Sequence, residues 1–210
     1  MYLFNRQIRL DGGQLLDSLD WAARMTEKVN ALSETPIALW APFGSLSART
    51  LSWTSVVQDF AQLETMNAKT LADEGYVALA DEGATFGSGD PIDDRLSRLV
   101  HIDADGADGQ YSRVVVAQAA SGQGLASVEV AIEIAEASKA IIGTGTTVAS
   151  SLSGPYGTIA WFTLFPTIEE LQESSEQLAA HPSFAKLVDE KGSKVFAPGS
   201  GLTTMWRKAI

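Results

Sequence analysis

The sequence contains no cysteine and only two histidines, His101 and His181. Without cysteine the chain can form no disulfide bond, thiolate zinc site, iron–sulfur cluster or thiol nucleophile. No pattern in the sequence brings the two imidazoles together, so we expect no histidine metal site and no cofactor held by one. The lack of cysteine fits a reducing compartment, and we expect a cytoplasmic protein.

Positive charge and long apolar runs are also scarce. The 210 residues include 15 lysines and arginines against 26 aspartates and glutamates, which gives a formal net charge of −11 at pH 7. Nucleic acids and anionic membranes attract clustered cations, so we expect neither as a partner. No segment approaches the roughly 18 apolar residues of a membrane-spanning helix. The N-terminal sequence MYLFNRQIRLDGG lacks the pattern of a signal peptide, and we expect a soluble, unprocessed chain.

The most informative feature that is present is an internal repeat. The segment from Leu51 to Glu82 aligns without a gap on the segment from Ile159 to Glu190, at the offset of 108 residues that separates Trp53 from Trp161. Similar residues recur along the alignment, and both segments end in Asp-Glu. We interpret the chain as two similar halves, residues 1–102 and 111–210, with a connector at residues 103–110.

Hydrophobic periodicity predicts the same order of elements in both halves. A period of two places Tyr2, Phe4, Arg6 and Ile8 on one face of the first strand. The predicted elements of the first half are strand 2–10, helix 14–32, strands 37–43 and 51–57, a helix at 58–71 with a further turn at 76–79, and strand 96–102. Those of the second half are strand 111–119, a helix containing residues 125–135, strands 146–151 and 159–165, a helix that starts at Pro166, and strand 203–210. The order β-α-β-β-α-β is that of a ferredoxin-like unit.

The strand predicted at residues 159–165 is apolar on both of its faces, which is typical of a strand buried on both sides. A four-stranded antiparallel sheet that carries its helices on one face leaves the other face bare. We therefore predict an α+β fold in which two ferredoxin-like repeats pack their antiparallel sheets face to face.

The sequence LAAHPSFAKLVDE, at residues 178–190, resembles the ending of the second helix in the dimeric α+β barrel superfamily, in its NIPSNAP-like and antibiotic-biosynthesis-monooxygenase-like branches. The resemblance implies that the two repeats form one intrachain α+β barrel around a central cavity. The chain would then be an internal pseudo-dimer, and further association into a homo-oligomer stays open.

Some members of this superfamily bind haem through a histidine four residues beyond the aromatic residue of the same helix ending. This chain has Val188 four residues beyond Phe184 and Ala80 four residues beyond Tyr76. The haem chemistry of the superfamily is therefore not carried over, and we expect no cofactor. His181 stands beside a proline and is expected to end a helix.

The remaining motifs do not predict a catalytic centre. The acidic connector resembles a calcium loop, but Ala107 and Val114 stand at the fifth and twelfth positions counted from Asp103, where ligands are needed. An acidic connector is the favoured interpretation. The paired glycines lack the phosphate-loop spacing, and no G-x-S-x-G elbow occurs.

Aromatic and polar residues on the predicted strands are the candidate ligand-binding residues. A pocket with aromatic walls and a few convergent polar groups is typical of small-molecule sites. The candidates are Trp53, Trp161, Asn5, Gln7, Arg98, His101 and Arg207. Simple packing is the alternative for the tryptophans. Asn5 and Gln7 correspond to Val114 and Val116, so a cavity lined by that strand face would be asymmetric.

Three functions follow from this reading. The first is binding of a small apolar or aromatic molecule in a central cavity. The second is a cofactor-independent monooxygenase or isomerase, which the superfamily resemblance implies. The third is a non-catalytic assembly module with a filled barrel. Fold does not choose among them, and whether the chain is an enzyme stays open.

Overall fold

The computed structural model describes residues 1–11, 15–44, 49–87, 89–90, 92–103 and 109–209. Most of the predicted connector, residues 104–108, lies outside the described residues. The chain divides into two compact units, the first formed mainly by residues up to 96 and the second mainly by residues 97–207. Among the described helices, none is long and apolar enough to cross a bilayer.

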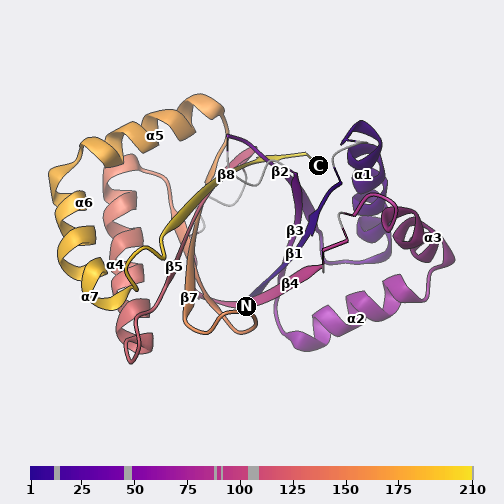
Figure 1. Cartoon of the computed structure of the whole chain (residues 1–210), viewed down its shortest axis with the longest axis horizontal. Coiled ribbons are helices and arrows are strands. Elements are labelled where there is room, and N and C mark those ends of the chain that lie inside the picture. The colour runs from indigo at the N-terminus through magenta and orange to yellow at the C-terminus, as the bar shows by residue number, and fades with distance from the viewer. Residues whose placement is uncertain (12–14, 45–48, 88, 91, 104–108, 210) are drawn as a thin grey trace. The chain divides into compact units, whose positions relative to one another are not determined.

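The first unit has a sheet with three helices on one face (Figure 1). Strand β3 is central, because it pairs antiparallel with both β1 and β2. Helix α1 buries an apolar stripe that includes Trp21, Met25 and Val29. The elements are β1 (Tyr2–Arg9), α1 (Leu15–Leu32), β2 (Ala38–Pro42), β3 (Thr50–Val57), α2 (Phe60–Leu71), α3 (Glu74–Gly83) and the start of β4 (Asp93–His101), whose residues from Ser97 onward fall in the second unit.

The second unit repeats this plan with a longer helical segment before its last strand. Strand β7 pairs with β5 and β6, and β5 also pairs with β8. The elements are β5 (Tyr111–Gln118), α4 (Gly124–Ile142), β6 (Thr146–Ser151), β7 (Thr158–Phe165), α5 (Ile168–Ala180), α6 (Pro182–Leu187), the π-helix η2 (Val188–Gly192), α7 (Ser193–Val195) and β8 (Leu202–Lys208). The β-α-β-β-α-β order is confirmed in both halves.

Strand register shows the repeat residue by residue. Trp53 on β3 lies opposite Arg6 and Leu39, and Trp161 on β7 lies opposite Val115 and Val148. All eight strands belong to one closed antiparallel barrel, in the order β1-β3-β2-β8-β5-β7-β6-β4. The predicted fold class is therefore confirmed.

Several predicted element boundaries were wrong, and side-chain caps explain two of them. Pro166 does not start a helix, because the Thr167 side chain accepts a hydrogen bond from the Glu170 N–H and α5 begins at Ile168. The helical turn expected at residues 76–79 is a ten-residue helix, α3, capped by Asp73. Strand β4 begins at Asp93, inside the segment that the sequence analysis leaves as a loop.

Candidate functional site

A pocket of about 350 Å³ lies in the first unit, between its sheet and its helices. The helix-facing side of β1 and β3 forms one wall, and α1, α2 and α3 form the others. The lining is mostly apolar and includes Phe4, Ile8, Trp21, Met25, Trp53 and Met66. This volume falls in the range of small-molecule sites.

A second depression, of about 420 Å³, lies between α1 and the end of α3. Its lining is mainly charged and polar. The cation there, Arg24, is hydrogen-bonded to both Asp20 and Glu82. Because these charges already satisfy one another, the apolar pocket is the better candidate site.

Two arginines line the apolar pocket, Arg6 and Arg9, and Arg9 pairs with Asp90 at 3.7 Å. The Arg6 Nε and Nη2 donate to the two carboxylate oxygens of Asp94, at 2.7 and 2.6 Å. The hydrogen bonds to Asp94 raise the pKa of Arg6, burial opposes the rise, and Tyr76 adds to it. The side chains of Arg6 and Asp94 are 35% and 42% exposed, so the pair orients the guanidinium and contributes little stability. Arg6 also lies over the ring of Phe4, at 5.7 Å from its centroid.

Two tryptophans form the apolar wall. Trp21 and Trp53 meet edge to face, with ring centroids 5.9 Å apart. The Trp53 Nε1 donates to Thr26 Oγ1 on α1 at 2.9 Å, and the Trp21 Nε1 donates to the carbonyl of Leu79 on α3 at 2.7 Å. Because both indole N–H groups are satisfied in this way, the rings offer carbon surface to a ligand.

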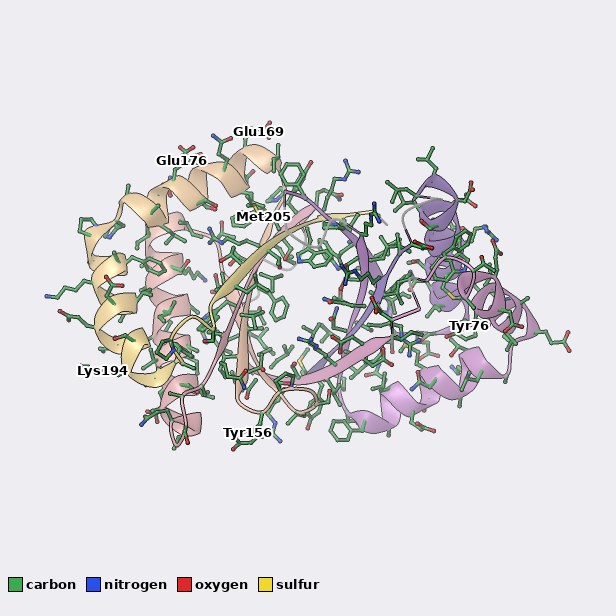
Figure 2. All side chains as sticks on the ribbon, viewed as in Figure 1. Tyr76, Tyr156, Glu169, Glu176, Lys194 and Met205 are labelled. Carbon is green, nitrogen blue, oxygen red and sulfur yellow. The ribbon has the colours of Figure 1, made fainter. Side chains whose placement is uncertain are left out.

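Helix α3 forms the wall opposite the sheet and carries Tyr76, which Figure 2 labels. Asp73 caps α3 by accepting the Tyr76 N–H, and it also pairs with Lys28 of α1 at 2.8 Å. Arg24 of α1 pairs with Glu82 of α3 at 2.5 Å. These hydrogen bonds lower the pKa of Asp73 and of Glu82. Two ion pairs therefore tie α3 to α1 across one side of the pocket.

Of the candidates from the first half, the structure brings only Trp53 to this pocket. Asn5 and Gln7 lie on the opposite face of β1 from Arg6, since side chains alternate along a strand. The Asn5 Nδ2 donates to Ser52 Oγ at 2.6 Å and to the Trp53 carbonyl at 3.2 Å. Asn5 and Trp53 thus lie on paired strands but face different sides of the sheet.

The other candidates belong to the second unit. Trp161 packs against Phe196 in that unit's core, with ring centroids 5.4 Å apart. Arg98 on β4 and Arg207 on β8 are exposed, and His101 is half-buried at the end of β4. His181 ends α5 and immediately precedes α6, as the sequence analysis predicts.

The sequence analysis missed Arg6, Tyr76 and Asp94 as site residues. A signal for Arg6 was present, because it is the one charged residue on the strand face that also carries Tyr2, Phe4 and Ile8. A charge on an apolar, helix-facing stripe is expected to have a partner of opposite charge, and Asp94 is that partner. Asp94 could not be assigned, since it lay in a predicted loop.

The pocket does not fit haem ligation. Ala80, where the resemblance would place a haem ligand in the first half, lines the pocket with a methyl group. Neither histidine is among the described residues that line it. In the part of the chain that the structure describes, no group of three or more histidine, aspartate or glutamate side chains could hold a metal ion.

No protein-family model matches the chain, and no curated protein sequence matches it. A candidate monooxygenase from Fusobacterium nucleatum superposes on 100% of this chain and 92% of its own, with a TM-score of 0.71 and 8% identity. A candidate monooxygenase from Lactobacillus acidophilus covers 99% and 93%, with a TM-score of 0.68 and 8% identity. An anthrone oxidase-like protein covers 100% and 91%, with a TM-score of 0.69 and 10% identity.

The chain has the dimeric α+β barrel fold. The similarity spans both repeats, so the barrel fold accounts for the whole chain. At 8–10% identity the comparison establishes the barrel fold and not a reaction, because one fold hosts many activities. The NIPSNAP-like or monooxygenase-like branch of the barrel fold stays a prediction.

Proposed function

We propose that the protein binds a small, largely apolar aromatic molecule in the pocket of the first unit. The observation that supports this proposal is the combination of tryptophan walls with one cation, Arg6, that two hydrogen bonds to Asp94 hold in place. Aromatic surface supplies most of the binding free energy of such a ligand, and one polar group fixes its orientation. This pocket lies between the sheet and the helices of the first unit. Ligand binding in the central cavity of the barrel, which the sequence analysis expects, stays a separate prediction.

The charges around Arg6 favour an uncharged ligand. Asp94 accepts two of the five N–H donors of the guanidinium and neutralises its charge. Arg9 and Asp90, which also line the pocket, form a second ion pair at 3.7 Å and add no net charge. A neutral aromatic molecule with one oxygen acceptor, such as a phenol or a quinone, can accept a hydrogen bond from a remaining Arg6 N–H.

A cofactor-independent oxygenase is the second candidate function. The full-length similarity to two candidate monooxygenases and to an anthrone oxidase-like protein favours it. In an oxygenase of this kind, Arg6 would stabilise the negative charge that develops on a phenolic oxygen during oxidation. A non-catalytic assembly module is the remaining alternative, and it requires no ligand.

The test is calorimetric and fluorescence titration with N-phenyl-1-naphthylamine and with a panel of neutral phenols and quinones. We expect Arg6→Met to weaken binding of the oxygen-bearing ligands about 10-fold or more, since a hydrogen bond from a charged donor contributes about 1.5–3 kcal/mol. Arg49→Met is the control, because Arg49 is an exposed arginine of the first unit outside the pocket.

Oxygen uptake in the same samples separates the candidate functions. Oxygen uptake that requires a phenol, and that is slower in the Arg6→Met variant than in the wild type, supports the oxygenase. Saturable binding without uptake supports a binding protein. If no ligand of the panel binds, or if Arg6→Met and Arg49→Met behave alike, the proposed site is wrong.

A further inference from the structure

Gly87 and Phe196 occupy equivalent places in the two units. Each forms an isolated antiparallel bridge with the residue that follows the first strand of its unit, Leu10 with Gly87 and Ala119 with Phe196. The neighbouring hydrogen bonds repeat as well. The Asp11 N–H donates to the Phe86 carbonyl, and the Ala120 N–H donates to the Val195 carbonyl, both at 2.8 Å. The backbone is thus built the same way at both places.

In the second unit this position fills space beside the repeated tryptophan. The Phe196 ring stands edge to face on Trp161, with centroids 5.4 Å apart and an interplanar angle of 73°. Phe196 packs on the same core cluster as Val115 and Val128. Phe196 therefore covers Trp161 on the helix-facing side of the second sheet.

In the first unit residue 87 leaves open space, and Trp21 of α1 meets Trp53 edge to face instead. Gly87 lines the pocket together with Trp53, the counterpart of Trp161. A Cβ built on Gly87 would meet no atom within 4 Å. The φ angle of Gly87 is not positive, so this backbone conformation does not require glycine.

We propose that this position decides which half of the chain holds a ligand. Gly87 leaves space for a ligand beside Trp53 in the first half. Phe196 covers Trp161 in the second half and so closes an aromatic site there, which we call the latent site. The part of the proposal that concerns the first half rests on the proposed function, whereas the part that concerns the latent site does not. Because Val115 stands where the first half has Arg6, the latent site would accept a wholly apolar aromatic molecule with no oxygen acceptor.

The experiment counts binding sites with N-phenyl-1-naphthylamine, which is neutral and fluoresces in apolar surroundings. We expect one site per chain in the wild type. Gly87→Phe should remove it or weaken binding at least 100-fold. Phe196→Gly should add a second site, and the double variant should keep one. Gly201→Phe is the control for an added phenylalanine, because Gly201 also has open space around its Cβ and lies outside the pocket.

Far-ultraviolet circular dichroism and thermal unfolding check that each variant is folded, and Phe196→Ala replaces Phe196→Gly if the glycine variant does not fold. If the Gly87→Phe variant binds the probe as tightly as the wild type does, the role proposed for Gly87 is wrong, while the proposed function stands. If the wild type binds no probe, the proposed function fails, and the Phe196 variants still decide the latent site. If a folded Phe196 variant gains no second binding site for the probe, the proposed latent site over Trp161 is wrong.

Discussion

At the scale of single residues, close packing and intrinsic propensity act in opposite directions at Gly83. Glycine inside a helix is about 1 kcal/mol less favourable than alanine, so propensity alone predicts that Gly83→Ala stabilises α3. A Cβ at Gly83 would, however, lie 2.1 Å from Trp21 Cζ2 and 2.6 Å from Cε2. The Trp21 ring is buried between α1 and α3, and Trp53 and Phe86 also pack on it.

We therefore expect Gly83→Ala to destabilise the protein by about 1–3 kcal/mol, the usual cost of overpacking a core. Urea unfolding followed by tryptophan fluorescence measures this change. Gly192→Ala is the matched control. Gly192 has helical angles, and its Cβ would make ordinary contacts at 3.7 and 3.8 Å, so this change should be neutral or slightly stabilising. A stabilised Gly83→Ala protein would show that Trp21 can move aside.

At the scale of elements, the two ion pairs between α1 and α3 make the pocket wall sensitive to acid. Lys28 lowers the pKa of Asp73, and Arg24 lowers the pKa of Glu82. A carboxylate whose pKa is lower in the folded state stabilises the fold at pH values above its unfolded pKa. That stabilisation is lost as the pH falls through the lower, folded value. The carboxylates are partly exposed to solvent, so the effect is modest and salt screens it.

The test of this linkage is Asp73→Asn, which removes the charge while asparagine still caps α3. Wild type and variant should differ in urea midpoint at neutral pH, and the difference should shrink below about pH 4. Asp59→Asn is the control, because Asp59 caps α2 through the Gln62 N–H in the same way. If Asp59→Asn and Asp73→Asn give parallel curves, the Lys28 pair contributes nothing measurable.

At the scale of the whole molecule, the repeat made the architecture predictable. Trp53 and Trp161, which are related by the repeat in the sequence, occupy equivalent register positions on their strands. The order of the elements could be predicted because the same hydrophobic patterns occur in both halves. The sequence predicted that a helix ends at His181, and it did not predict the helical segment from α6 to α7. Its turns expose most of their residues, so they show no apolar stripe.

The candidate site was only partly predictable. Trp53 could be selected because a tryptophan recurs at the equivalent position of the second half. The side of the sheet that it faces depends on the strand register, which a hydrophobic pattern does not determine. The pocket lies where the first unit has Gly87 and the second unit has a bulky residue, Phe196. Hydrophobic periodicity cannot reveal a missing side chain. The equivalence of Gly87 and Phe196 becomes clear only when the bridges Leu10–Gly87 and Ala119–Phe196 are compared.

The two repeated tryptophans allow a test of this difference within one chain. Trp53 and Trp161 are equally buried, at 5% and 7% exposure, and each donates one indole hydrogen bond. Truncation to alanine costs about 3–5 kcal/mol in a filled core, because a new cavity opens. Trp161 lies in a core cluster with Phe196 against its ring, whereas Trp53 already borders a pocket on one side, so its truncation enlarges an existing space. We expect Trp161→Ala to reduce the free energy of unfolding by about 1–2 kcal/mol more than Trp53→Ala, as measured by urea denaturation without ligand. Equal losses, or a larger loss for Trp53→Ala, would mean that the first unit is packed as tightly as the second.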